Sequence, residues 1–328
     1  MNAFDYAAPT RIEDAVKLLG EPESAALSGG TDLLGRLKDE VSAPKRVVYL
    51  KDIKPLAGIS GDASSGLTLG AGTPLAQVLE SKAVKEGYPA LWQSTLEVGT
   101  PQIRNMATVG GNLLQRPRCW YFHAGNGLLG MKDGKSLVRE GDNRYHAIFM
   151  TSGDALFVNP SSLAVPLIAL EAKAVVAGPK GERTVPVEEL YQVPKSDKDS
   201  ELTVGPGELL TKIMIPPARG KNASYEVRQK QAHDWPLVMA SVNLRMDGDN
   251  VASSRVVLYG VAPVPYRCEA AEAAIAGKAV TTETASAAGE AATTGAAPLS
   301  MNGYKVALTK TSVKRALLAA IGKPYWEF

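Results

Sequence analysis

The spacing of apolar residues over the first 58 positions predicts a small α/β unit. "RIEDAVKLLG" places its apolar residues three and four apart and ends at Gly20, which is typical of a short amphipathic helix. "AALSGG" is a short extended run that enters a turn, and "KRVVYL" is a second β-rich run. Between them, "TDLLGRLKDE" predicts another short helix, with Thr31 or Asp32 as its candidate N-cap.

From residue 59 the pattern is longer and more mixed. "GLTLGAGTPLAQVLES" predicts a strand, a glycine turn and a helix that Thr73 and Pro74 open. "YPALWQSTLEVG" is helix-like, and "TPQIRNMATVGGNLLQ" carries a β-compatible run before two glycines. Residues 116–147 are polar and glycine-rich, so we expect a long loop there. "DALFVN", "SSLAVPLIALEAKAVVAG" and "ELLTKIMIP" then predict a strand, an apolar helix and further strands.

The last third of the chain predicts a separate α+β domain. "SYEVRQKQ", "VMASVNLRM" and "SSRVVLYGVAP" alternate apolar and polar residues, as antiparallel strands do. "CEAAEAAIAG" and "SVKRALLAAIG" predict helices, and the low-complexity "TTETASAAGEAATTGAAPLS" predicts a weak helix or a mobile connection. We therefore expect domains at residues 1–218 and 219–328, the first with subdomains at about 1–58 and 59–218.

Composition excludes several classes of function. Hydrophobic residues make up 45% of the 328 positions, which is enough for folded cores. The net charge of +2 gives no electrostatic reason to expect nucleic acid or a membrane surface as a partner. No apolar stretch reaches the ~18–20 residues of a membrane span, and the first residues do not resemble a signal peptide. We expect no direct membrane insertion and a cytoplasmic location.

Two pairs of adjacent glycines are the strongest candidates for a ligand site. Gly29 and Gly30 lie in "SGGTDLL", and Gly110 and Gly111 lie in "ATVGGN". Glycine pairs permit positive φ and remove Cβ atoms, so backbone amides can approach a phosphate. Taken by itself, the first stretch favours an ordinary turn over a ligand site, and it matches neither the Rossmann nor the P-loop pattern. Two such turns could instead face each other across one extended ligand such as a dinucleotide.

Together, "SGGTDLL" and "TPQIRNMATVGGNLLQ" resemble the FAD-binding subunit of the molybdenum hydroxylases. That family includes the medium subunits of xanthine dehydrogenase, aldehyde oxidoreductase and carbon monoxide dehydrogenase. The resemblance covers nearly the whole chain and implies an α+β protein. Its first part would be a two-subdomain FAD-binding fold of the vanillyl-alcohol-oxidase or PCMH type. Its second part would be a C-terminal flavoprotein domain with an antiparallel sheet plus helices.

The resemblance also implies a set of cofactor-binding residues for noncovalent FAD. The first glycine turn would wrap the pyrophosphate, and the second would line the other side of the cofactor. Leu210 would contact the adenine or flavin region, and Ser162 stands where many relatives place aspartate near FAD. Several relatives carry lysine where this chain has Glu226, and Lys230 is the candidate substitute. The implied residues are Leu27, Ser28, Gly29, Gly30, Thr31, Asp32, Leu33, Thr108, Gly110, Gly111, Asn112, Ser162, Leu210 and Lys230.

"NLLQRPRCWYF" and "NRYHAI" resemble the aldehyde-oxidising branch of the family. Some members of that branch hold an extra iron–sulfur cluster, with one cysteine like Cys119 and three more in the following loop. This loop lacks the other three cysteines, so we expect no iron–sulfur cluster in this chain and no metal ligands. Cys119 and Cys268 are its only cysteines, and we expect both in a reducing compartment.

The implied function is an electron-transfer subunit without catalytic acid or base residues of its own. It would receive electrons from partner 2Fe–2S clusters and pass them through FAD to an external acceptor. The partners would be a molybdopterin-binding large subunit and a 2Fe–2S small subunit, and the complex would be periplasmic if a partner carried an export signal. Two alternatives stay open on sequence: a stand-alone FAD oxidase or reductase of the same fold, and a binding protein for a phosphorylated ligand.

Overall fold

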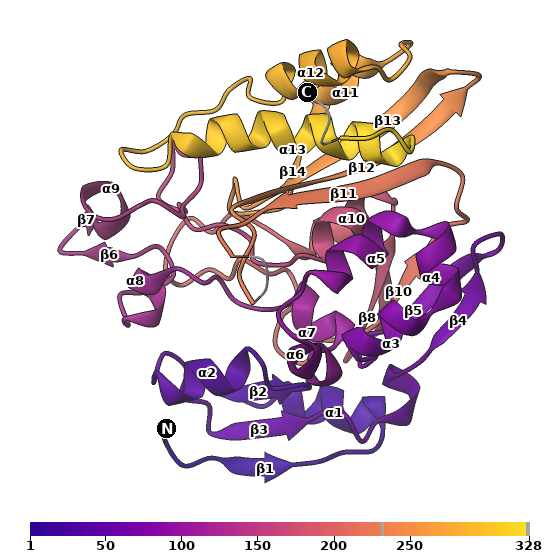
Figure 1. Ribbon diagram of the computed structural model, residues 1–328. Coiled ribbons are helices and arrows are strands. Elements are labelled where there is room, and N and C mark those ends of the chain that lie inside the picture. Colours follow the sequence, from indigo (N-terminus) through magenta and orange to yellow (C-terminus); the bar gives the residue numbers. More distant parts are fainter. Residues whose placement is uncertain (231–232, 326–328) are drawn as a thin grey trace.

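Three structural units follow one another along the chain in the computed structural model, which describes residues 1–230 and 233–325. The N-terminal unit, indigo in Figure 1, lies at the bottom of the molecule. The second unit occupies the middle and the C-terminal unit the top, and an irregular segment projects to the left. The three units are thus stacked in the same order as they occur along the chain.

The N-terminal unit is a parallel sheet in the order β1-β3-β2, with two helices. Its elements are β1 (Asp5–Ala7), α1 (Ile12–Leu19), β2 (Ser24–Leu27), α2 (Leu33–Lys38) and β3 (Arg46–Tyr49). The α1 helix buries Ala15, Val16 and Leu19, as the helical spacing of its sequence predicts. These residues share a core with Ala177 and Leu209 of the second unit, so the two units pack together.

The second unit is built on an antiparallel sheet in the order β4-β5-β10-β8-β9. Its strands are β4 (Ile59–Asp62), β5 (Gly66–Gly70), β8 (Lys173–Gly178), β9 (Gly181–Pro186) and β10 (Leu209–Ile215). Its helices are α3 (Leu75–Glu80), α4 (Lys82–Gly87), α5 (Pro89–Leu96), α6 (Pro101–Met106), α7 (Val109–Leu113) and α10 (Ala164–Ala169), with short 3-10 turns at Lys54–Leu56 and Val187–Leu190. Every residue of α10 is buried, as its uninterrupted apolar sequence predicts.

The segment before the second glycine pair is helical, which corrects the β-compatible interpretation of its sequence. Thr100 and Thr108 begin α6 and α7, and each threonine hydroxyl accepts a hydrogen bond from a backbone N–H three residues later. Pro101 occupies the first turn of α6, where a missing N–H costs nothing. Capping therefore outweighs the β preference of the short apolar run.

The expected loop at 116–147 contains short elements and a small core of its own. These elements are α8 (Trp120–His123), β6 (Met131–Lys132), β7 (Lys135–Ser136) and α9 (Leu137–Glu140). Phe122, Leu128, Leu129 and Phe157 pack together beneath them. Residues 154–159, which the sequence predicts as a strand, have irregular backbone instead.

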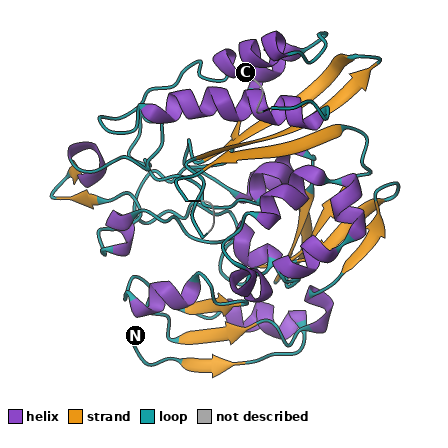
Figure 2. Cartoon of the chain, viewed as in Figure 1, coloured by secondary structure: helices purple, strands orange, loops and turns teal. Residues whose placement is uncertain are grey.

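The C-terminal unit is an antiparallel sheet in the order β11-β12-β13-β14, covered by helices on its outer face (Figure 2). Its elements are β11 (Lys221–Val227), β12 (Val238–Asp247), β13 (Asn250–Tyr259), β14 (Tyr266–Arg267), α11 (Glu269–Ile275), α12 (Thr282–Ala291) and α13 (Tyr304–Ala320). The low-complexity stretch forms α12, which begins with a reciprocal capping box between Thr281 and Thr284. Small alanine side chains let α12 pack closely on α13, so the first half of this stretch is a helix packed against the rest of the unit.

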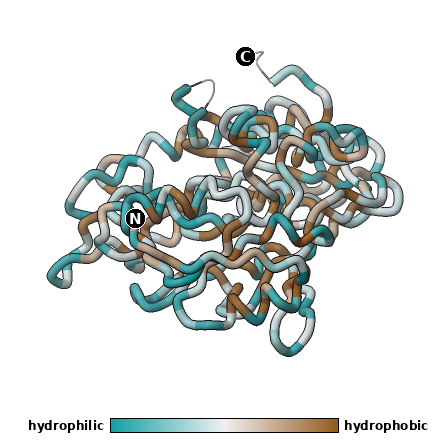
Figure 3. Tube along the Cα trace, turned by 90° about the horizontal axis from the view of Figure 1, so that it is seen from below, coloured by the Kyte–Doolittle hydropathy of each residue, from teal (hydrophilic) through white to brown (hydrophobic). Residues whose placement is uncertain are grey.

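Apolar segments run through the interior of the trace and hydrophilic ones gather in the outer loops (Figure 3). Met239, Val257 and Tyr259 of the C-terminal sheet belong to the same core as the second unit. These two units are therefore joined through a continuous apolar contact. Within residues 1–230 and 233–325, no helix has both the length and the apolar character to cross a membrane.

Candidate functional site

A cavity of about 760 Å³ lies between the N-terminal unit and the second unit. Pockets for small ligands and cofactors typically measure about 300–1,000 Å³. Its lining includes the loops that follow β2 and precede α7, the start of β10, and the segment 200–208. The expected residues that line it are Ser28, Gly29, Gly30, Thr31, Asp32, Leu33, Thr108, Gly110, Gly111 and Leu210.

The two glycine turns meet at one wall of this cavity. The hydroxyl oxygens of Ser28 and Thr108 are 3.0 Å apart and share a hydrogen bond. Thr108 also accepts a hydrogen bond from the N–H of Gly111 at 3.2 Å, so one hydroxyl links the two turns and caps α7. The sequence hypothesis that the two turns face one ligand thus has a geometric basis.

Gly29 is required by the way the backbone packs. A Cβ atom at this position would lie 2.0 Å from the carbonyl oxygen of Met106, at the end of α6. Gly30 has a φ of +76°, a conformation that residues with a side chain rarely adopt. The first turn therefore needs glycine at both positions before any ligand is considered.

The two turns present different backbone groups to the cavity. In the described part of the chain, the N–H groups of Gly29, Gly30 and Thr31 donate to no protein acceptor. Those of Gly110 and Gly111 donate to Ala71 and Thr108. The first turn can therefore donate hydrogen bonds to a ligand, whereas the second contributes a surface without side chains.

Four expected residues do not line the cavity. Asn112 is 5% exposed, and its amide oxygen accepts hydrogen bonds from Ser161 Oγ at 2.9 Å and Leu163 N at 3.1 Å. Ser162 is also buried, and Leu27 is half-buried at the end of β2. Lys230 is exposed, and its backbone N–H donates to Asp234. Asn112 holds α7 against the start of α10, a role that motif reasoning did not identify.

The cavity also has charged and apolar lining residues that sequence reasoning missed. Arg36 and Arg116 line the part beside the first turn. Leu202, Val204 and Pro206 line another part, and Leu56 belongs to the apolar wall. These residues come from segments far apart in the chain, so no local motif links them. A polar region with two arginines and an apolar region suit a ligand that has both characters.

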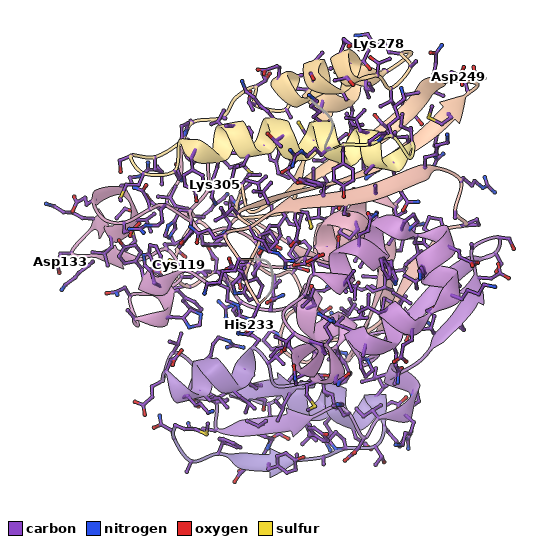
Figure 4. All side chains as sticks on the ribbon, in the orientation of Figure 1. Cys119, Asp133, His233, Asp249, Lys278 and Lys305 are labelled. Carbon is purple, nitrogen blue, oxygen red and sulfur yellow. The ribbon has the colours of Figure 1, made fainter. Side chains whose placement is uncertain are left out.

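A second cavity of about 180 Å³ adjoins Cys119, His146 and Lys305. Cys119 and Lys305 lie on the same side of the molecule (Figure 4). The Cys119 sulfur is 3.2 Å from His146 Nε2, and burial raises the pKa of the thiol. Burial lowers the pKa of Lys305 to about 7, and its Nζ donates to three backbone carbonyls. Among the described residues, no three His, Cys, Asp or Glu side chains lie close enough to hold a metal ion.

Glu226 is a buried carboxyl group on β11, and Arg228 lies beside it. Burial raises the pKa of Glu226 to about 8, with the negative charge of Asp234 adding to the shift. Arg228 Nη1 lies 3.3 Å from Glu226 Oε1 and also pairs with Glu97. Lys230, the candidate substitute for a lysine at position 226, has an exposed side chain, and its role stays a prediction.

The fold and the cavity define the class of protein first. The cavity joins a turn with unused N–H groups to an apolar region, and this lining suits a ligand with phosphate and apolar parts, such as a dinucleotide. Residues 2–218 match the family model "FAD binding domain in molybdopterin dehydrogenase". Residues 223–320 match the "CO dehydrogenase flavoprotein C-terminal domain". The chain therefore belongs to the family of FAD-binding subunits of molybdenum hydroxylases, which are oxidoreductases.

Individual relatives match along almost their entire length. The aldehyde oxidoreductase FAD-binding subunit PaoB of Escherichia coli is 30% identical over 325 residues, covering 98% of this chain and 99% of the relative. The carbon monoxide dehydrogenase medium chain of Hydrogenophaga pseudoflava is 30% identical and covers 97% of this chain and 96% of the relative. A solved structure of carbon monoxide dehydrogenase from Hydrogenophaga pseudoflava superposes with a TM-score of 0.76 at 28% identity, covering 98% of both chains.

These comparisons confirm the family, the α+β flavoprotein fold and FAD as the cofactor that the family binds. They also confirm the assignment to the oxidoreductases. The individual cofactor-binding residues stay predictions, because the comparisons do not test them. The domain boundaries at 218 and 219 stay predictions for the same reason.

Proposed function

We propose that the chain holds FAD noncovalently in the cavity between its two glycine turns. The observation that carries this proposal is the Ser28–Thr108 hydrogen bond, which joins the turns at the wall of a cavity of about 760 Å³. The unused N–H groups of Gly29, Gly30 and Thr31 would donate to the FAD pyrophosphate. Thr108, Gly110 and Gly111 would form the surface on which the cofactor lies, and Leu210 would contact it from β10.

Three other expected residues would act behind the cofactor. Leu27 ends the strand that positions the first turn, and Asn112 fixes α7 through its contacts with residues 161 and 163. Ser162 lies in the buried segment beside them and has no charge to give the cofactor. We infer no direct role for the exposed side chain of Lys230 in the conformation described.

When bound, FAD would be the carrier that takes electrons from partner 2Fe–2S clusters and passes them to an external acceptor. The contribution of this chain is to bind and orient that carrier and to limit its contact with water. The partners we propose are a molybdopterin-binding large subunit and a 2Fe–2S small subunit. The relatives carry names such as "medium chain" and "FAD-binding subunit", which support membership of a multi-subunit complex.

Titration of the purified, flavin-free chain with FAD tests the cofactor proposal. The flavin fluorescence should be quenched to a stoichiometric end point, and the saturated chain should retain a flavin spectrum after gel filtration. A chain that leaves FAD fluorescence unchanged would exclude both this proposal and a stand-alone FAD enzyme. It would favour the third hypothesis, a binding protein for another phosphorylated ligand.

Purification from the native host tests the partnership. We expect two further subunits to co-purify, with molybdenum and iron detectable by elemental analysis. A chain that runs alone and oxidises a substrate unaided would contradict the subunit hypothesis and support the stand-alone alternative. Fractionation of the same cells tests the cytoplasmic location that we propose. Recovery in the periplasm would indicate export with a partner.

A further inference from the structure

Five charged side chains gather where the first glycine turn meets the segment after α7. They are Asp32, Arg36, Arg116, Arg118 and Glu201. The exposed fraction of these side chains is 29% for Arg116, 27% for Arg118 and 14% for Arg36. It is 15% for Asp32 and 2% for Glu201. All five side chains are therefore largely buried. Unbalanced charge is costly in a buried site.

The cluster has one positive charge more than its carboxylates can neutralise. Arg36 Nε lies 3.1 Å from Asp32 Oδ2, and Arg118 Nη2 lies 2.9 Å from Asp32 Oδ1. Arg116 pairs with Glu201 through its Nε. Three guanidinium groups thus face two carboxylates, and arginine does not lose its proton in proteins. An anion is the group that would complete this arrangement.

Arg116 is the member of the cluster with the most unused hydrogen-bonding capacity. It contacts Glu201 only through Nε, and among the described residues neither of its Nη groups donates to a protein acceptor. Its guanidinium lies over the ring of Phe122, 5.3 Å from the centroid, which orients the plane of the group. Arg36 also lines the cavity, but its Nε and Nη1 already donate to Asp32 and Ser42.

The members of the cluster face two different cavities. Asp32, Arg36 and Arg116 line the large cavity, whereas Arg118 lines the small one. Asp32 alone would repel a phosphate, but Arg36 and Arg118 each pair with one of its two carboxylate oxygens. The negative charge of Asp32 is thereby neutralised, and its carboxylate fixes the positions of the two arginines.

We propose that Arg116 binds the diphosphate of FAD with its free Nη groups, and that Asp32 positions Arg36 and Arg118 beside it. This inference rests on the proposed function and adds side-chain charge to the backbone amides of Gly29, Gly30 and Thr31. A guanidinium with free Nη groups matches the spacing of phosphate oxygens. Removing a charge-assisted hydrogen bond typically weakens binding by about ten- to one-hundredfold.

A comparison of two flavins tests the inference on the full flavin-free chain. FAD contains the diphosphate, whereas riboflavin has the same ring system without phosphate. Arg116→Gln should raise the Kd for FAD about ten- to one-hundredfold and leave the Kd for riboflavin unchanged. FAD binding to the variant should also depend less on ionic strength than binding to the parent chain. An equal loss for both flavins would overturn the inference.

Arg255→Gln is the matched control. The Arg255 side chain is 24% exposed and pairs with Glu171 and Glu188 away from the cavity, so its loss should not change either Kd. Glu201→Gln tests whether the Arg116–Glu201 ion pair serves only to hold the fold together or whether Arg116 itself binds FAD. It breaks the same ion pair but frees Arg116, so FAD should bind at least as tightly as to the parent chain.

Arg116→Lys covers the case in which Arg116→Gln does not fold. It keeps the positive charge and loses the two-pronged geometry, and an intermediate FAD Kd is expected. If Glu201→Gln weakened FAD binding as much as the Arg116 variants, the ion pair would be structural and the inference would be wrong. If the parent chain itself bound no FAD, the proposed function would fail instead, which keeps the two outcomes distinct.

Discussion

At the scale of single residues, Gly29 has two functions that the sequence could not separate. Its missing Cβ lets the first turn pass close to Met106, and its N–H is free to donate to a ligand. The sequence predicted only the second function. The first depends on a backbone contact with α6, a helix that the pattern of this segment did not predict.

Gly29→Ala should disturb both folding and FAD retention. The new methyl group would lie 2.0 Å from the Met106 carbonyl oxygen, so the turn or α6 must move. We expect a loss of about 1–3 kcal/mol in the free energy of unfolding, together with weaker FAD binding. Urea denaturation and FAD titration measure the two effects.

Gly35→Ala in α2 is the control for that substitution. Nothing lies within 4 Å of a Cβ at position 35, and alanine is the better helix former. This variant should be as stable as the parent chain or up to about 1 kcal/mol more stable, with unchanged FAD affinity. A Gly29→Ala protein that behaved like Gly35→Ala would contradict the close approach at Met106.

At the scale of elements, helix N-caps and short connections determine the backbone structure around the cavity. Thr108 begins α7 and meets Ser28 of the first turn, so one side chain joins an N-cap to a contact between units. Asp32 is the N-cap residue of α2, as the sequence hypothesis allowed, but its side chain makes no capping hydrogen bond. The Asp32 carboxylate accepts from Arg36 instead, because an arginine four residues along the helix reaches it.

Asn112→Ala should loosen the junction between α7 and α10. Removing the amide oxygen leaves the Ser161 hydroxyl and the Leu163 N–H, both buried, without this acceptor. The free energy of unfolding should fall by about 1–3 kcal/mol, measured by urea denaturation. Asn126→Ala, at a half-buried site in the loop segment, should cost less. Equal losses in the two variants would argue against the structural role of Asn112.

At the scale of the whole molecule, His146 connects the loop segment to α13. Its side chain contacts Cys119, and its backbone carbonyl accepts from Asn302 and Lys305. Burial lowers the pKa of His146 to about 4, and the positive charge of Lys305 adds to the shift. The folded chain therefore keeps this imidazole neutral at pH values where an unfolded chain would protonate it.

The stability of the chain should fall on acidification between pH 6.5 and pH 4. An unfolded histidine titrates near 6.5, and His146 in the folded chain near 4, so the unfolded state binds more protons in this window. The contribution is fully present above pH 6.5 and amounts to on the order of 3 kcal/mol. His146→Gln should flatten this acid limb in urea denaturation at a series of pH values. An unchanged slope would refute the buried neutral imidazole.

The sequence by itself determined the family, the cofactor class and most of the regular elements. Apolar spacing specified α1, α10 and the long strands, because these elements bury a continuous face wherever they pack. The motifs around Gly29 and Gly110 are contiguous in the chain, so the residues themselves carried the resemblance. Local features of this kind do not depend on the rest of the fold.

Tertiary structure alone decided which residues surround the cavity. Ser28 and Thr108 are 80 positions apart, and Arg116 and Glu201 are 85 apart, so neither contact leaves a local pattern. Arg116 has the sequence surroundings of an exposed loop arginine, yet the fold buries most of it beside an acidic partner. Asn112, which lies within the motif, turns away from the cavity because two buried donors need its oxygen. Hydrogen bonds and ion pairs between residues far apart in the sequence therefore determine which side chains line the cavity.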